Sequence, residues 1–462
     1  MRLWPTITRR LQGLNRLSRL AVAVSLFVSC TLTEGEGQTH QGGYWHTNAE
    51  HILDEQSQLV HIRGISWYGF ETPNGVVGGL YTQDYKKVLS TLKSQGFNTI
   101  RIPYSSEMVE TPSVAPNIAF ANKLGPINSD LRGLNSLEVL DKIVVYASRT
   151  GLRIILDHHR SESGNTAEAN GLWYTSEYPE SSWLADWVTL AYRYQGDPTV
   201  VGFDLHNEPH STADGAGACW DCGSSNDWHL AAERAGNVIL DANPNLLIFV
   251  EGVDTYKGDS YWWGGNLEGV ATSPVVLLKP GHLVYSAHDY GPHEQSQRWF
   301  NSSTTPVSLA SVWTKHWAYI SQSHIAPVYL GEFGTTNEDL DLQNDAPGSQ
   351  GQWFSSLVDF LNADQELNWG YWAVNGEDHY GLFSETYKID SVNESKVALL
   401  QSGHPKPPFF SFARHLSAFL PTGGGLASLF SCFLIAASGM TVGLVFKSRS
   451  SKDVAQEDRE PV

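Results

Sequence analysis

Basic residues are scarce in this chain of 462 residues: 30 Lys and Arg stand against 49 Asp and Glu, a formal net charge of −19. A surface this acidic repels phosphate backbones, so we expect no nucleic-acid partner. Charged residues of both signs together make up only 17%, whereas hydrophobic residues reach 41%. This composition is typical of a packed globular protein and excludes a disordered one. We expect the protein to be a monomer.

Cysteine is equally scarce, with four residues. Cys30 and Cys432 fall in the uncharged runs near the two ends, which leaves Cys219 and Cys222 in the body. A zinc site would need two more ligands nearby, and none is paired with these two in an obvious way. In an oxidising compartment the pair is interpreted as a local disulfide that staples a loop. We predict no metal and no organic cofactor.

The amino-terminal end carries the pattern of a secretory signal. An uncharged run at residues 20–32 follows a basic segment that contains Arg9, Arg10, Arg16 and Arg19. Basic residues followed by a short apolar stretch are typical of signal peptides. We therefore predict a signal peptide at residues 1–38, with an uncleaved signal anchor as the alternative.

The carboxyl-terminal end predicts a membrane span. Residues 426–446 are nearly all apolar or small, and a run of this length spans the ~30 Å hydrocarbon layer. Lys447, Arg449 and Lys452 follow at once, which places the tail at 447–462 in the cytoplasm. A linker at 413–425, with three glycines at 423–425, separates the span from the body. A buried helix is the alternative. A lipid-anchor signal is less favoured because a polar segment follows the run.

These ends predict a single-pass type I protein whose body is extracellular or lumenal. Two glycosylation sequons, which begin at Asn301 and Asn393, agree with that compartment.

Predicted strands and helices alternate along the body at 39–412, a pattern typical of an α/β barrel. Short β-rich runs occur at residues 61–67, 98–103, 152–157, 200–205, 246–251, 283–288, 327–330 and 370–373. Amphipathic stretches lie between them, among others at 83–95, 136–150, 182–194 and 228–242. Eight strands, each followed by a helix, predict a closed parallel (β/α)8 TIM barrel.

Two glutamates stand at the ends of predicted strands, where a barrel carries its active site. Glu208 follows the fourth strand in Asn-Glu-Pro, and Glu332 ends the seventh strand in Gly-Glu-Phe-Gly. Two carboxyls that face each other are what cleavage of a glycosidic bond requires, one as proton donor and one as nucleophile. Either motif alone is weak evidence, but the pair on these two strands predicts a glycoside hydrolase.

The chain from about Gly42 to Ala413 resembles glycoside hydrolase family 5, most closely the bacterial endo-β-1,4-glucanases of that family. The stretches that carry the resemblance lie at residues 43–47, 151–157, 200–210, 261–267 and 331–336. The resemblance implies a retaining endo-β-1,4-glucanase that hydrolyses β-glucan by double displacement.

The resemblance also implies a role for each matching residue. Glu208 matches the general acid/base and Glu332 the nucleophile. Arg101 matches the arginine that keeps the nucleophile ionised, and Asn207 the residue that binds the sugar 2-hydroxyl. The other matching catalytic residues are His159, His288 and Tyr290. The aromatic residues expected to bind substrate are Trp372, Trp262, Trp263 and Trp67.

Two departures from the family pattern concern the cleft. Pro73 and Ser163 stand where relatives can join the loops after strands one and three by a disulfide. Tyr81 and Val374 stand where relatives have tryptophan, so fewer sugar platforms are expected. Other activities of the family remain alternatives, namely β-mannanase, β-1,3-glucanase and glycolipid glycosidase. A non-catalytic carbohydrate-binding surface protein is a further alternative.

Overall fold

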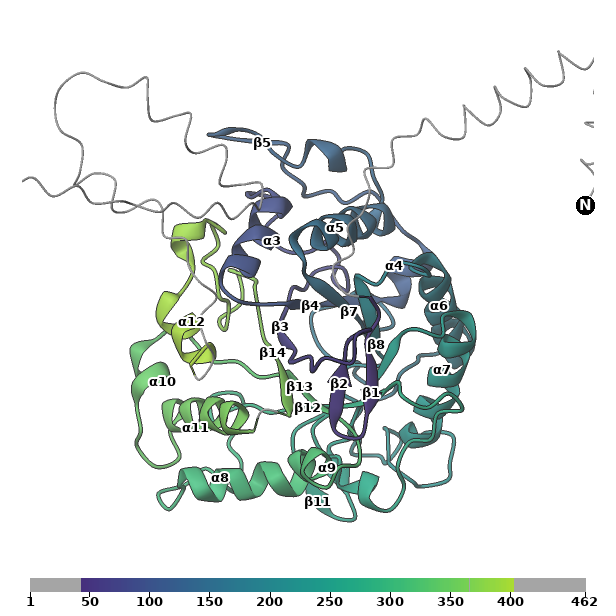
Figure 1. Cartoon of the computed structure of the whole chain (residues 1–462), viewed down its shortest axis with the longest axis vertical. Coiled ribbons are helices and arrows are strands. Elements are labelled where there is room, and N and C mark those ends of the chain that lie inside the picture. Colours follow the sequence, from purple (N-terminus) through teal and green to yellow (C-terminus); the bar gives the residue numbers. More distant parts are fainter. Residues whose placement is uncertain (1–42, 365, 403–462) are drawn as a thin grey trace, which may run out of the picture. The chain divides into compact units, whose positions relative to one another are not determined.

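The computed structural model describes residues 43–364 and 366–402, and their central feature is a closed barrel of eight parallel strands (Figure 1). The barrel strands are β3 (Arg63–Ser66), β4 (Thr99–Ser105), β7 (Arg153–Arg160), β8 (Val200–Asp204), β9 (Leu247–Glu251), β12 (Leu283–His288), β13 (Val328–Glu332) and β14 (Leu367–Tyr371). β14 pairs with β3 and closes the ring. The predicted barrel is confirmed.

Neighbouring residues of a barrel strand pack into two different apolar layers. Ile155 and Phe249 are fully buried in the interior of the barrel, whereas their neighbours Ile154 and Ile248 belong to the larger core. This alternation follows from the extended backbone, which points successive side chains to opposite faces of the sheet. The interior is therefore packed solid, and chemistry is confined to the strand ends.

Helices surround the barrel. Their bounds are α3 (Tyr85–Ser94), α4 (Ser106–Glu110), α5 (Ser136–Thr150), α6 (Glu180–Arg193), α7 (Trp228–Ala242), α8 (Pro306–Trp313), α9 (Tyr319–Gln322), α10 (Asp339–Gln343), α11 (Gln350–Ala363) and α12 (Glu394–Leu400). A π-helical turn at Thr314–Ala318 joins α8 to α9. Asn135 and Glu138 form a capping box at the start of α5, and Gly151 ends that helix in the left-handed region with φ 70°. The predicted helices at 136–150 and 228–242 match α5 and α7 residue for residue.

Two details of the predicted barrel are wrong. No α-helix lies between β9 and β12 in the described residues; this link carries the hairpin β10 (Thr255–Tyr256) and β11 (Asp259–Ser260) and a 3-10 turn at Glu268–Ala271. Glycine and proline recur along this segment, and both destabilise helices.

The last strand is also shifted: it was predicted at 370–373 but begins at Leu367. The prediction missed it because polar Asn368 interrupts the apolar run. In the structure the Asn368 side chain accepts from the Ile62 N–H at 2.7 Å and donates to the Val328 carbonyl at 3.2 Å. This amide therefore bridges the strands on either side of β14.

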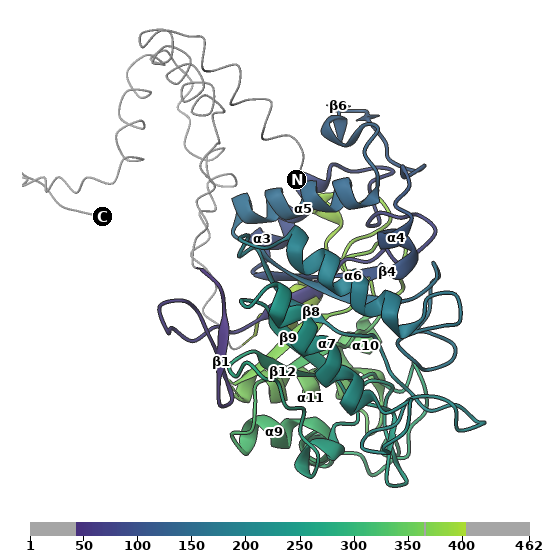
Figure 2. The same ribbon diagram turned by 90° about the vertical axis from the view of Figure 1, so that its right-hand side faces the viewer.

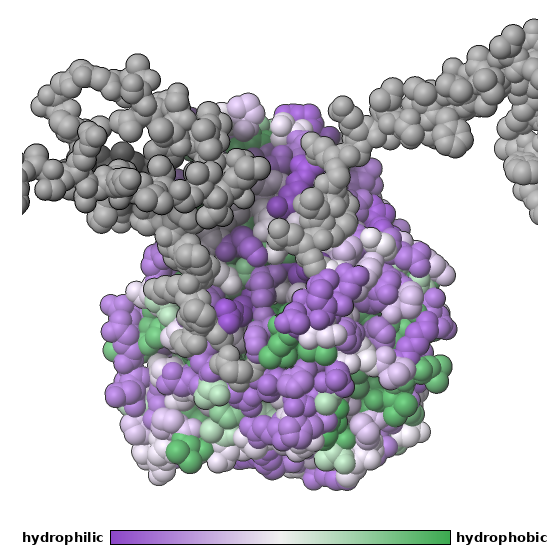
Figure 3. Space-filling view, in the orientation of Figure 1, coloured by the Kyte–Doolittle hydropathy of each residue, from purple (hydrophilic) through white to green (hydrophobic). Residues whose placement is uncertain are grey.

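A hairpin closes one end of the barrel. Its strands β1 (His46–Asn48) and β2 (His51–Leu53) lie across the amino-terminal ends of the barrel strands (Figures 1 and 2). Trp45 and Ile52 are buried against the interior layer, and the Thr47 N–H donates to the Gly281 carbonyl just before β12. The surface on this side is mostly hydrophilic, with scattered apolar residues (Figure 3). The opposite end, where the strands finish, is left for a ligand. A further two-stranded hairpin, β5 (Ala121–Asn122) and β6 (Gly125–Pro126), lies outside the barrel.

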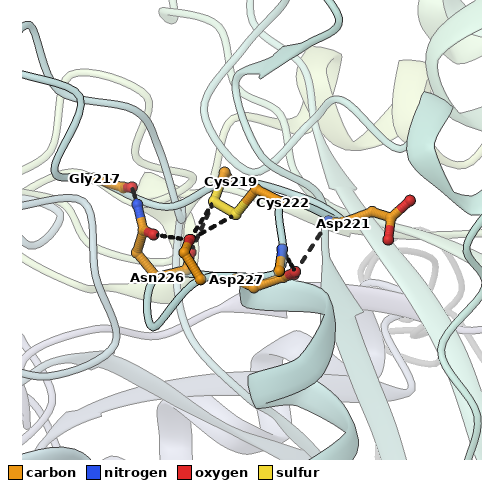
Figure 4. Close-up of a disulfide and its surroundings, with 8 residues drawn as sticks. Gly217, Cys219, Asp221, Cys222, Asn226 and Asp227 are labelled. Atoms are coloured by element: carbon orange, nitrogen blue, oxygen red, sulfur yellow. Dashed lines mark hydrogen bonds between the residues drawn. A yellow bond between two sulfur atoms is a disulfide. The ribbon is translucent and has the colours of Figure 1, made fainter.

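The predicted disulfide joins Cys219 to Cys222 in the loop between β8 and α7 (Figure 4). Asp227, just before α7, accepts from the backbone N–H groups of Asp221 at 3.1 Å and Gly223 at 2.7 Å. The disulfide and this carboxylate together tie the loop to the first turn of α7.

The predicted signal peptide at 1–38, linker at 413–425, membrane span at 426–446 and tail at 447–462 lie outside the described residues. Among the residues that are described, no helix combines the length and the apolar character needed to cross a membrane.

Candidate active site

A cavity of about 760 Å³ opens at the carboxyl ends of the barrel strands. Its walls come from loops that follow most of the strands, and both predicted catalytic glutamates, Glu208 and Glu332, line it. Asn207, His159 and Tyr290 line it as well. The structure therefore brings the predicted residues of four separate strand ends into one site.

A buried guanidinium forms the floor of this site. Arg101, on β4, is fully buried and donates through Nη1 to Oε1 of Glu332 at 2.6 Å and through Nε to Oδ2 of Asp204 at 2.9 Å. Its Nη2 lies 3.1 Å from Oδ1 of Asn207, 3.1 Å from Oδ1 of Asp157 and 3.2 Å from Oε1 of Glu251. Burial opposes the charge of Arg101, but the surrounding carboxylates hold its pKa well above the ordinary value.

Glu332 is held as a carboxylate. Burial alone would raise its pKa, but the positive charges of His288, Arg101 and His159 outweigh burial and bring the pKa below the ordinary value. The hydroxyl of Tyr290 adds a hydrogen bond, which it donates to Oε2 of Glu332 at 2.9 Å. A nucleophile needs this ionised form.

Glu208 approaches from the opposite wall. It follows β8 with a left-handed backbone, φ 53°, which is rare for a residue with a long side chain. Its Oε1 lies 3.2 Å from Nδ1 of His288, and its side chain is 19% exposed, against 5% for Glu332. One ligand atom from each of Glu208, His288 and Glu332 lies within 4.8 Å of the other two. The two carboxyls therefore lie close together, with one oxygen of each within 4.8 Å of the other.

Aromatic side chains line one wall of the cavity beside His159. Trp372, directly after β14, stacks on Tyr68 with ring centroids 5.2 Å apart and on His159 at 5.7 Å. Its indole N–H donates to Asp378 at 3.0 Å, which fixes the plane of the ring. His159 lies 2.7 Å from Asp157; burial lowers the pKa of His159, but the charge of Asp157 outweighs it and the pKa is raised.

Trp262 and Trp263 also line the cavity but differ in exposure. Trp263 is 47% exposed and stacks on His210 with centroids 3.7 Å apart, whereas Trp262 is 6% exposed and meets the Tyr290 ring edge-on. Trp263 therefore presents the larger apolar surface.

The prediction for Trp67 is wrong. Its side chain is fully buried, and its indole N–H donates to the Gly78 carbonyl at 3.0 Å. Adjacent residues of an extended segment point to opposite sides, so Tyr68 lines the cavity in its place. The alternation of side chains along the strand was the signal that could have distinguished the two.

The structure adds groups that sequence reasoning missed. Glu71 lines the cavity, and burial raises its pKa to about 7. The Gly164 N–H donates to the Glu71 carbonyl at 2.9 Å, so a hydrogen bond joins the loops after β3 and β7, where Pro73 and Ser163 leave no disulfide. Glu251, which ends β9 and is fully buried, is another such group. A lone glutamate in a loop carries no pattern that would have revealed Glu71.

Three clusters of carboxylates and histidines lie close enough to consider a metal, but a basic side chain already contacts each of them. Arg101 contacts two, and Lys315 and Arg298 contact Asp259 in the third. We assign no metal ligand in these clusters.

A parallel barrel that holds an ionised carboxylate and a second carboxyl close together at its strand ends defines a glycoside-cleaving hydrolase. The family described as cellulase (glycosyl hydrolase family 5) matches residues 53–378. An endoglucanase of Paenibacillus polymyxa is 46% identical over 337 residues, which cover 72% of this chain and 80% of that protein. The major extracellular endoglucanase of Xanthomonas campestris is 31% identical over 392 residues, 83% of this chain and 75% of that protein.

Solved structures agree with these relatives. An endocellulase of Pyrococcus horikoshii, studied in complex with cellotetraose, is 32% identical, covers 78% of this chain and 98% of that one, and has a TM-score of 0.70. This chain belongs to glycoside hydrolase family 5 and is a hydrolase of the cellulase type.

We expect Tyr290→Phe to raise the pKa of Glu332, because the variant removes a hydrogen bond that favours the carboxylate. The acidic limb of kcat/KM against pH then moves to higher pH, since more alkaline solution is needed to ionise Glu332. Tyr380→Phe is the matched control, because the Tyr380 hydroxyl donates to Glu294 at 3.1 Å. Identical acidic limbs for the two variants would contradict this assignment.

Proposed function

We propose that this chain is a retaining endo-β-1,4-glucanase that hydrolyses β-glucan by double displacement. The observation that carries the proposal is the close approach of Glu208 and Glu332, each of which places an oxygen within 4.8 Å of the other. Retaining glycosidases keep their carboxyl groups about 5–5.5 Å apart, whereas inverting enzymes need roughly 6.5–9.5 Å to admit a water molecule.

The two glutamates then take different roles. Glu332 attacks the anomeric carbon, and Glu208 gives a proton to the departing sugar oxygen. In the second step Glu208 takes a proton from water, which attacks the same carbon and releases Glu332. Arg101 and Tyr290 support this division, since both donate to Glu332. Asn207 accepts from Arg101 through Oδ1, and this orients its amide N–H for the sugar 2-hydroxyl.

Substrate binding follows from the aromatic lining. The faces of Trp372 and Trp263 suit the apolar faces of β-linked glucose units, and Trp262 borders the same space. Relatives named endoglucanase and a related endocellulase studied with cellotetraose support a β-1,4-glucan.

The purified chain should act faster on a β-1,4-glucan than on β-1,3-glucan, β-mannan or a glucosylated lipid. Proton NMR of the first products should show the β-anomer before mutarotation. An α-anomer formed first would contradict retention. Faster action on mannan or on the lipid would transfer the substrate assignment to that alternative.

The glutamates should respond differently to azide. Glu208→Ala lacks the proton donor, so on a dinitrophenyl cellobioside the glycosyl-enzyme still forms, and azide releases it as the β-glycosyl azide. Glu332→Ala lacks the nucleophile and should yield no β-product. Rescue of Glu332→Ala to a β-product, with none for Glu208→Ala, would reverse the roles. Wild-type activity in both variants would contradict a catalytic role for either residue.

We also propose a type I topology, with a signal at 1–38, the catalytic barrel at 39–412, a linker at 413–425, a span at 426–446 and a cytoplasmic tail at 447–462. The uncharged run and the basic residues that follow it support this topology.

The full-length protein should stay with membranes through a carbonate wash, and a chain ended after residue 413 should appear in the medium. An epitope placed after Lys447 should be reached only in permeabilised cells. Full-length protein that washes off, or an epitope that is accessible on intact cells, would contradict the topology.

A further inference from the structure

A third glutamate lies directly behind the catalytic pair. Glu251 ends β9 and is fully buried. Its Oε2 accepts a hydrogen bond from the backbone N–H of Glu208 at 2.8 Å. Its Oε1 lies 3.2 Å from Nε2 of His288 and 3.2 Å from Nη2 of Arg101. The Glu251 carboxylate therefore contacts the backbone of Glu208. It also contacts two cationic groups, His288 and Arg101, that lie against Glu332.

The contact with the Glu208 N–H falls where the backbone is strained. A left-handed conformation is unfavourable for a glutamate and persists only where its surroundings enforce it. The β-carbon that an alanine would add at Gly264 would lie 2.1 Å from Oε2 of Glu251 and 3.2 Å from the Glu208 Cα. Only glycine at position 264 leaves room for the carboxylate to reach Glu208.

The contact with His288 links the same carboxylate to the Glu208 side chain. His288 lies between Oε1 of Glu251 on its Nε2 side and Oε1 of Glu208 on its Nδ1 side. Burial lowers the pKa of His288, but the charges of Glu251 and Glu332, with the contact to Glu208, outweigh burial and raise it well above the ordinary value. The imidazolium therefore lies at ion-pair distance from both glutamates, from Glu251 through Nε2 and from Glu208 through Nδ1.

We propose that Glu251 is a positioning residue that holds the acid/base Glu208 in place, through the Glu208 backbone N–H and through His288. This inference rests on the proposed function, because it concerns the acid/base role of Glu208. Glu251 itself never touches the substrate.

The chemistry of the three contacts makes the carboxylate irreplaceable by an amide. Glu208, His288 and Arg101 all present N–H groups, so every neighbour needs an acceptor. In Glu251→Gln the NH2 group must face either the Glu208 N–H or the two cations, and one contact becomes a repulsion between donors. The variant keeps the volume of the side chain.

The test compares aryl β-cellobiosides with good and poor leaving groups on the full-length protein. A displaced acid matters most when the leaving group needs a proton. Glu251→Gln should therefore lower kcat/KM by roughly 100-fold on phenyl cellobioside and by much less on the dinitrophenyl compound. Asp204→Asn is the matched control, because this buried carboxylate also pairs with Arg101, at 2.9 Å, but through Nε rather than through the Nη2 that Glu251 contacts. Asp204→Asn should lower kcat/KM by the same factor on both substrates.

A second measurement does not depend on activity. Nitrogen NMR should show the pKa of His288 falling in Glu251→Gln, because the imidazolium loses an anionic partner, and staying high in Gly264→Ala, which keeps the charge. Gly264→Ala should reproduce the dependence on the leaving group and replaces Glu251→Gln if that variant does not fold.

The outcomes separate the two claims. If Glu251→Gln and Gly264→Ala each lowered kcat/KM by the same factor on both substrates, the positioning role would be overturned. Glu251 would then act only as a counter-charge of Arg101. A wild-type chain inactive on every cellobioside would contradict the proposed function instead. The His288 titration tests the contact itself, whatever the activity: an unchanged pKa of His288 in Glu251→Gln would overturn the inference.

Discussion

The buried guanidinium of Arg101 is the group on which the rest of the site depends. Four carboxylates, Asp157, Asp204, Glu251 and Glu332, lie within ion-pair distance of it inside the barrel mouth. A carboxylate buried without a partner loses far more hydration than any packing returns, and it would take up a proton. With Arg101 present, Glu332 keeps its charge and is available as a nucleophile.

The barrel makes this concentration of charge feasible. Its interior is filled by apolar side chains and its amino-terminal end is closed by the β1–β2 hairpin, so polar groups gather only where the strands finish. Several strands end in polar groups, and neighbouring strands hold these groups within reach of one another. Glu208 differs, because it lies beyond β8 on a strained backbone and needs Glu251 and His288 to keep its direction. The proposed division between Glu332 as a rigid nucleophile and Glu208 as a supported acid/base follows from these two environments.

Much of this could be predicted from the sequence, because the position of a residue at a strand end is itself a sequence pattern. Glu208, Glu332, Arg101 and His288 were found in that way. The prediction for Trp67 failed, because successive side chains of a strand point to opposite sides, and it is the neighbouring Tyr68 that lines the cavity. The role of Glu251 depends on contacts with β8, β4 and β12, and on the left-handed φ of Glu208, and neither is written in a local pattern. Asn368 hid the start of β14 because its amide is satisfied only by residues distant in the sequence.

Arg101 is central because we propose that it keeps Glu332 ionised as the nucleophile. The most direct test is to treat the enzyme with a dinitrophenyl 2-deoxy-2-fluoro-cellobioside, which slows release of the glycosyl-enzyme, and to locate the label by mass spectrometry of peptic peptides. We expect a single fluorocellobiosyl group on Glu332, and loss of labelling in Arg101→Met. A label on Glu208, or labelling that is undiminished in Arg101→Met, would contradict it.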